Sequence, residues 1–191
     1  MDETRANMTP PIAGDREAQH PASYQNRPHP PNAGWAPRLL ADGMLGTLAK
    51  WLRLLGYDTV FAPSLDDHAL ARLARAEGRV LLTRDRALAA RRGLQSLLVR
   101  EEELEAQIAQ VVQALGLPPR AEPRCAACNG ELAVVPKEAV QSLVPPYVFH
   151  TQNEFRRCLS CGRIYWRGTH WPHIAARLAE WSRVDSEDSQ P

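Results

Sequence analysis

Short apolar segments alternate with amphipathic helical segments from Arg38 to Gly116. Four runs rich in Leu and Val predict strands, and the segments between them carry apolar residues at helical spacing. The predicted strands are 38–41, 58–62, 79–83 and 94–99, and the predicted helices are 45–55, 68–77, 84–93 and 101–116. Such alternation is typical of an α/β domain whose mainly parallel sheet is built by right-handed crossovers and flanked by helices.

The four cysteines of the chain form two pairs, Cys125-Ala-Ala-Cys128 and Cys158-Leu-Ser-Cys161. Two CxxC pairs separated by 29 residues are typical of a small β-rich zinc ribbon, in which four thiolates close a tetrahedral structural site. The N-terminus has no apolar core of the kind that a secretory signal needs. Thiols in a reducing compartment are more often metal ligands than disulfides. We therefore expect bound Zn²⁺, with four unliganded thiols as the alternative.

Composition sets the remaining boundaries. Seven of the 16 prolines lie in the first 37 residues, which show almost no periodic apolar pattern and are typical of a disordered tail. The predicted order is a tail (1–37), the α/β domain (38–117), a linker (118–123), the zinc ribbon with a C-terminal helix (124–177) and a polar tail (178–191). No apolar run approaches the length of a membrane span, so we expect a cytoplasmic protein that does not contact membranes. The net charge of +1 does not by itself favour a polyanionic partner.

Acidic residues follow the predicted strands. Asp42 comes directly after the first, Asp85 after the third, and Asp66 and Asp67 begin the helix after the second. The carboxyl ends of parallel strands share one edge of a sheet, where binding sites form. Carboxylates that converge there repel unless a cation such as Mg²⁺ or Mn²⁺ offsets their charge. A further candidate after the fourth strand is Glu101 or its neighbour Glu102.

Each acid also has an ordinary structural explanation. Aspartate is a favoured helix N-cap, so Asp66 or Asp67 taken alone is more often a cap than a ligand. The acids Glu101–Glu103 suit the start of a helix and its dipole. Asp42 and Asp85 are harder to explain in this way, because both end strands.

The segments ADGMLGTLAKWLRLLGYD, DDHALARLARAEGRVLLTRDRALA, VPPYV and FRRCLSCGRIYWRGTHW, with the first CxxC pair, resemble the PIN-like RNase domain at the C-terminus of Mut-seven exonucleases. The resemblance covers roughly Arg38 to His173. It implies a PIN-like fold fused to a zinc ribbon, and metal-dependent hydrolysis of RNA. The acidic positions of that family correspond here to Asp42, Asp67 and Asp85, and its hydroxyl residue corresponds to Thr83.

Basic residues in both halves are candidates for contacts with RNA, and aromatic residues interleave with those near the second cysteine pair, as suits single-stranded RNA. The alternative is that the aromatic rings pack around the ribbon. The candidates are Lys50, Arg53, Arg84, Arg86, Arg156, Arg157, Arg163 and Arg167.

Three functions compete at this point. The first is a Mg²⁺- or Mn²⁺-dependent ribonuclease, and the second is a non-catalytic RNA-binding protein whose acids are vestigial. The third is a phosphatase, since ADGML is similar to the Asp-Gly-Thr-Leu motif of haloacid-dehalogenase enzymes. Those enzymes need a nucleophilic aspartate where this chain has Leu40, which argues against covalent phosphoryl transfer. A protein partner cannot be predicted from the sequence.

Overall fold

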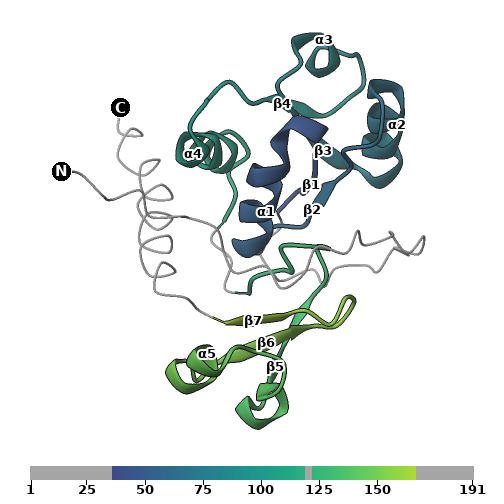
Figure 1. The fold of residues 1–191 in the computed structure, drawn as a ribbon. Coiled ribbons are helices and arrows are strands. Elements are labelled where there is room, and N and C mark those ends of the chain that lie inside the picture. The colour runs from purple at the N-terminus through teal and green to yellow at the C-terminus, as the bar shows by residue number, and fades with distance from the viewer. Residues whose placement is uncertain (1–35, 119–121, 167–191) are drawn as a thin grey trace, which may run out of the picture. The chain divides into compact units, whose positions relative to one another are not determined.

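In the computed structural model, which describes residues 36–118 and 122–166, four parallel strands form one sheet in the order β2-β1-β3-β4 (Figure 1). The strands are β1 (Arg38–Ala41), β2 (Thr59–Phe61), β3 (Arg79–Thr83) and β4 (Ser96–Leu98). The helices between and after them are η1 (Gly43–Leu45), α1 (Gly46–Leu54), α2 (Asp67–Glu77), α3 (Arg86–Ala89) and α4 (Leu104–Ala114). The described residues all belong to one structural unit, Pro31–Pro191.

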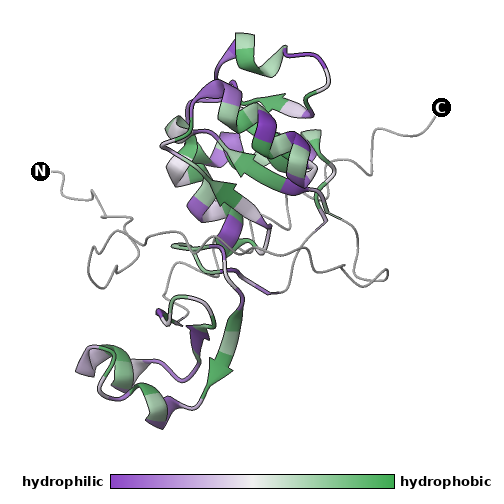
Figure 2. Cartoon of the chain, turned by 90° about the vertical axis from the view of Figure 1, so that its right-hand side faces the viewer, coloured by the Kyte–Doolittle hydropathy of each residue, from purple (hydrophilic) through white to green (hydrophobic). Residues whose placement is uncertain are grey.

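Helices cover both faces of this sheet. On one face Leu39 and Leu82 pack with residues of α1 and α4, among them Leu52 and Val111. On the opposite face Leu40 and Leu81 pack with residues of α2 and α3, including Leu70 and Leu88. Neighbouring residues of a strand point to opposite faces, so the central residues of β1 (39–41) and of β3 (80–82) are all apolar. Figure 2 shows hydrophobic colour over most of the length of the strand arrows in this sheet.

The second part of the described chain is a three-stranded antiparallel sheet in the order β5-β6-β7. Its strands are β5 (Leu132–Val135), β6 (Phe155–Cys158) and β7 (Ile164–Trp166), and η2 (Lys137–Val140) and α5 (Pro146–Thr151) lie between β5 and β6. Val140, Val144 and Phe155 form a small buried cluster beside one face of the sheet. A core of this size needs a further stabilising element.

The predicted fold class is confirmed, with shorter elements than the sequence indicates. Helix α4 begins at Leu104 rather than Glu101, because the side chain of Gln107 donates hydrogen bonds to the carbonyls of Glu101 and Glu102. Helix α3 has only four residues, since the chain turns after Ala90.

Residues 1–35 of the predicted N-terminal tail lie outside the described residues, and so do the C-terminal part of the ribbon segment, from residue 167 on, and the predicted C-terminal tail. The proposed domain boundaries therefore stay predictions. Among the described helices none is long and apolar enough to cross a membrane.

Candidate active site and metal centre

Thr83 connects the two aspartates that follow β1 and β3. Its hydroxyl donates a hydrogen bond of 2.7 Å to Oδ2 of Asp42 and accepts one of 3.0 Å from the backbone N–H of Asp85. Thr83 is fully buried, whereas both aspartates are partly exposed. The hydroxyl therefore fixes the Asp42 carboxylate beside the Asp85 backbone while leaving both carboxylates open to solvent.

The strand order explains why these residues meet. Strand β1 lies between β2 and β3, so the connection from β1 runs to one side and the connection from β3 to the other. At such a switch point the helices that follow the two strands diverge to opposite faces and leave a crevice at the carboxyl edge of the sheet. Asp42 follows β1, and Thr83 ends β3.

Local hydrogen bonds also hold the aspartates. Asp42 Oδ1 accepts from the backbone N–H of Gly43 at 2.5 Å, and Asp85 Oδ1 accepts from the N–H of Leu88 at 2.9 Å, which caps α3. A carboxylate has about four lone-pair directions, so each of these groups keeps capacity for a further ligand.

Asp66 and Asp67 have different roles at the start of α2. Asp66 is the N-cap, because its Oδ1 accepts from the backbone N–H of Ala69 at 2.8 Å, and this bond lowers the pKa of Asp66. Asp67 Oδ2 lies 3.3 Å from a guanidinium nitrogen of Arg91, and the same side chain donates to the Asp67 carbonyl at 3.1 Å. Asp67 is therefore the acid with its carboxylate free of a capping bond.

The aspartates do not converge on one point in the described structure. The only set of three or more His, Cys, Asp or Glu ligand atoms that lie within 4.8 Å of one another, among residues 36–118 and 122–166, is formed by the cysteines. Glu101 is exposed, three residues past the end of β4. The oxygen donors and their exposure suit a hydrated Mg²⁺ or Mn²⁺, which keeps several waters and needs few carboxylates.

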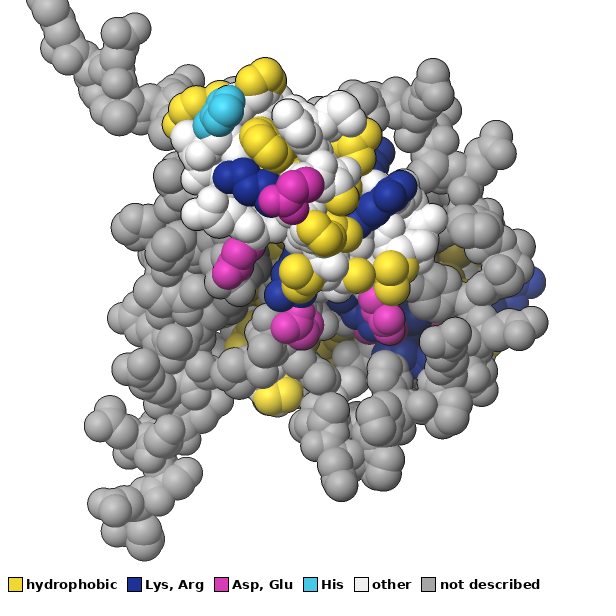
Figure 3. Space-filling view, turned by 90° about the horizontal axis from the view of Figure 1, so that it is seen from below, with side chains coloured by type: hydrophobic (Ala, Val, Ile, Leu, Met, Phe, Trp, Pro, Cys, Tyr) yellow, Lys and Arg dark blue, Asp and Glu magenta, His cyan; other side chains and the backbone are white. Residues whose placement is uncertain are grey.

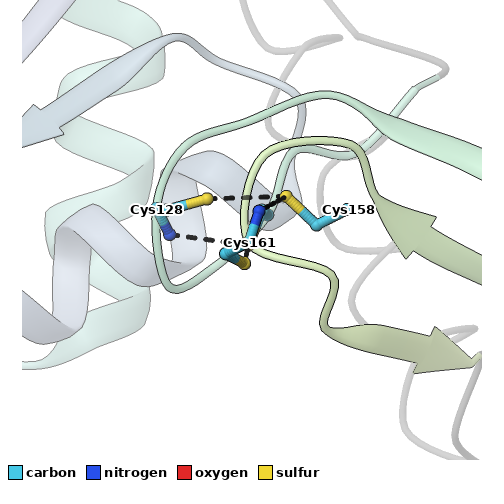
Figure 4. Close-up of side chains that lie close together, drawn as sticks. Cys128, Cys158 and Cys161 are labelled. Atoms are coloured by element: carbon cyan, nitrogen blue, oxygen red, sulfur yellow. Dashed lines mark hydrogen bonds between the residues drawn. The ribbon is translucent and has the colours of Figure 1, made fainter. Parts of the chain in front are cut away.

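The four cysteines form a compact donor set. The Sγ atoms of Cys125 and Cys161 lie 3.5 Å apart, as do those of Cys128 and Cys158. Figure 4 shows the sulfur atoms of Cys128 and Cys158 facing each other between the two loops. Four Zn–S bonds of about 2.3 Å in a tetrahedron place the sulfurs about 3.8 Å apart. The cluster therefore fits the predicted Zn²⁺ site.

The two cysteine loops have the same backbone geometry. In the first, Cys128 N–H points to Cys125 Sγ at 3.5 Å; in the second, Cys161 N–H points to Cys158 Sγ at 3.4 Å. The residue after the second cysteine has a positive φ in each loop, 65° at Asn129 and 73° at Gly162. The cluster thus consists of two matching turns.

Tyr165 supports the cluster through a hydroxyl 3.0 Å from Cys125 Sγ. Burial disfavours the Cys125 thiolate, but the hydrogen bonds to Tyr165 and the neighbouring cysteines outweigh burial and lower its pKa to about 7. Burial raises the pKa of Cys128, and it raises that of Cys161 to about 11. At neutral pH, Cys128 and Cys161 therefore keep their protons until a cation binds.

The candidate RNA-contacting residues fall into different environments. Lys50, Arg84, Arg86 and Arg157 are exposed, Arg163 is half-buried, and Arg156 is half-buried and paired with Glu122. Arg167 lies outside the described residues. On the face shown in Figure 3, Lys and Arg side chains are interspersed with acidic and hydrophobic ones.

Arg53, one of the candidate RNA-contacting residues, is buried. Arg53 is 5% exposed, and its guanidinium group donates hydrogen bonds to three backbone carbonyls. These acceptors occupy the side chain, so Arg53 is no longer a candidate for RNA contacts.

The sequence did not indicate the residues that support these sites from a distance. Asn129 donates to Asp58 at 2.7 Å, Asp58 pairs with Arg79 at 2.8 Å, and Arg91 contacts Asp67. The available signals were Asn129, a polar residue next to a cysteine, and Arg79, an arginine that begins a buried strand. Neither identifies its partner.

A family model described as the Mut7-C RNase domain matches residues 37–178. Comparison with curated proteins gave no match, and comparison with solved structures gave none either. The matched segment is well over half of the 191 residues and includes the candidate aspartates and all four cysteines. This family points to a nuclease with RNA as substrate, and the cysteine cluster is a possible zinc site within it. The chain therefore belongs to the Mut7-C RNase domain family.

Proposed function

We propose that this protein is a metal-dependent ribonuclease with a PIN-like active site at the carboxyl edge of the parallel sheet. The observation that carries the proposal is the buried Thr83 hydroxyl, which joins Asp42 to Asp85 at the topological switch point. Asp67 lies on the loop side of the same edge, at the start of α2. Aspartates held in this way have the donor chemistry that divalent cations need.

The residues of the chain have separable roles in this mechanism. Asp42, Asp67 and Asp85 would hold one or two Mg²⁺ or Mn²⁺ ions, which supply an activated water and offset charge at the scissile phosphate. Thr83 keeps Asp42 in one orientation, so the carboxylate does not lose rotamer freedom when substrate arrives. Arg84 and Arg86 are exposed on either side of Asp85 and would position the RNA backbone through charge-assisted hydrogen bonds.

The zinc ribbon has a structural role in the proposal and also contributes RNA contacts. A closed four-thiolate site leaves no open position for substrate. Arg157 and Arg163 are accessible on the ribbon, and single-stranded RNA is the substrate that suits them. The zinc-binding energy, about 10–16 kcal/mol in small zinc peptides, would stabilise a module whose core is small.

The test is cleavage of labelled single-stranded RNA by purified protein across a titration of Mg²⁺ and of Mn²⁺. Changing Asp42→Asn together with Asp85→Asn should abolish cleavage, while Glu138→Gln, an exposed acid in η2 of the ribbon, should leave it unchanged. Equal cleavage by the wild type and the double variant would show that the aspartates are not the catalytic groups.

A non-catalytic RNA-binding protein is the second candidate. The observation in its favour is that the aspartates do not form a compact ligand set in the described structure. This function predicts salt-sensitive RNA binding without turnover in any divalent metal. Binding that survives Asp42→Asn with Asp85→Asn, together with no cleavage by the wild type, would support it.

A further inference from the structure

Arg53 joins helix α1 to the first cysteine loop. Its Nε donates to the carbonyl of Thr59 at 2.7 Å, and Nη1 donates to the carbonyls of Ala126 and Ala127 at 2.9 and 3.1 Å. Ala126 and Ala127 are the two residues between Cys125 and Cys128. A buried cation is costly unless its donors are satisfied, and burial lowers the pKa of Arg53. The position of the cysteine loop therefore decides whether this charge is satisfied.

Asn129 makes a second connection, in which a side chain of the cysteine loop reaches the backbone at the start of β2. This residue of the cysteine loop is 3% exposed, and its Oδ1 accepts from the backbone N–H of Thr59 at 3.1 Å. Its Nδ2 donates to Asp58 Oδ1 at 2.7 Å, the oxygen that also accepts from Arg79 at 2.8 Å. The backbone N–H and the carbonyl of Thr59 are thus both bound by residues that depend on the cysteine loop.

Thr59 begins β2, the edge strand of the parallel sheet. The carbonyl of Asp58 faces β1, where it accepts from the N–H of Leu39 at 2.7 Å. Neighbouring residues of a strand direct their backbone polar groups to opposite sides, so the groups of Thr59 face away from β1. An edge strand needs partners for such groups. Arg53 and Asn129 supply them here.

The turn itself does not require the side chain of Asn129. Gly162 occupies the equivalent position of the second cysteine loop, with a φ of 73° against 65° for Asn129. Glycine adopts this conformation without strain. The amide of Asn129 therefore serves the contact with β2 and not the geometry of the loop.

We propose that Arg53 and Asn129 couple zinc binding at the four cysteines to the stability of edge strand β2, making the first cysteine loop part of the parallel-sheet domain. When zinc orders the loop, the loop holds the outward backbone groups of Thr59 and the charge of Arg53. When zinc is removed, β2 loses these partners, and so does the segment that leads from β2 to Asp67. The coupling does not rest on the proposed ribonuclease activity.

The experiment is hydrogen exchange on the full chain, with zinc bound and after chelation, in the absence of RNA. In the wild type, chelation should reduce protection of residues 59–61 as well as that of the cysteine loops. Asn129→Gly keeps the turn and removes one of the two contacts, so residues 59–61 should be less protected with zinc bound and should lose less protection on chelation than in the wild type. Lys50→Met, an exposed position on the same helix as Arg53, should behave as the wild type.

Reciprocity gives a second readout. If zinc stabilises β2 through these contacts, then Arg53→Met and Asn129→Gly must weaken zinc binding, by about 5- to 150-fold for an ordinary coupling. A competition titration with a chromophoric chelator measures this. A merely structural role would destabilise the protein equally with and without zinc. Unchanged protection of residues 59–61 on chelation of the wild type, or wild-type zinc affinity in both variants, would overturn the proposal.

Discussion

Replacing Thr83 by valine removes one hydroxyl and keeps the shape of a fully buried side chain. Two hydrogen bonds are lost, the 2.7 Å bond to Asp42 and the 3.0 Å bond from the N–H of Asp85. A hydrogen bond to a charged group contributes about 1.5–3 kcal/mol, and an unsatisfied buried N–H costs about 1–3 kcal/mol. Water can replace part of the first loss, because Asp42 is partly exposed. We therefore expect the free energy of unfolding to fall by about 2–4 kcal/mol.

Urea denaturation of the zinc-loaded protein measures this loss. With a denaturant slope of about 2 kcal/mol/M, the midpoint should fall by roughly 1–2 M. Cleavage should slow by about a hundredfold, since Asp42 is then free to leave its orientation. Thr83→Ser is the control: it keeps the hydroxyl and loses one methyl group, about 1 kcal/mol. If the valine variant is as stable and as active as the serine variant, the hydroxyl does not organise the site.

Three further changes test other contacts. Arg91→Gln should alter stability by less than about 1 kcal/mol, because its pair with Asp67 is partly exposed, but Mn²⁺ binding followed by paramagnetic resonance should tighten as a competing cation is lost. Burial would raise the pKa of Asp58, but the ion pair with Arg79 outweighs burial and holds this pKa below 3.8. The ion pair therefore stabilises the folded protein above pH 3.8, and this stabilisation is lost as pH falls through the lower pKa of the folded state. The difference in unfolding free energy between the wild type and Asp58→Asn should accordingly be largest above pH 5 and shrink below pH 3.8, with a constant difference counting against the ion pair. Gly78→Ala should cost about 1–2 kcal/mol in thermal unfolding, because the φ of 60° at this helix end strains a residue with a Cβ atom.

The sequence predicted the parallel sheet because its signals are local. The apolar run 80–82 of β3 is buried on both faces, which is the pattern of a central strand. The strand ends also predicted that Asp42 and Asp85 share an edge, since the carboxyl ends of parallel strands do so by construction. The structure places both residues at this edge, joined by Thr83. That they hold a metal stays a prediction.

The parts that could not be predicted depend on partners far along the chain. Helical spacing places Arg53 beside the apolar stripe of α1, and only the cysteine loop more than 70 residues later makes that position buried. Residue type likewise does not show whether Asp66 or Asp67 caps the helix, because both are aspartates. The amide of Ala69 and the guanidinium of Arg91 distinguish them.

The first cysteine loop contacts the parallel sheet at the amino end of a strand, whereas the aspartates lie at the carboxyl edge of that sheet. The first cysteine loop binds Asp58 and Thr59 at the amino end of β2, whereas Asp42 follows the carboxyl end of β1. Three residues of β2 separate these ends, about 10 Å at the usual rise per residue. An RNA molecule can therefore contact the ribbon and Asp42 at the same time only if it is long enough to reach both regions. Arg157→Ala should consequently weaken cleavage of long RNA in a salt-dependent way and leave the shortest cleavable oligonucleotide unaffected, whereas an equal effect on both would place the ribbon beside the aspartates.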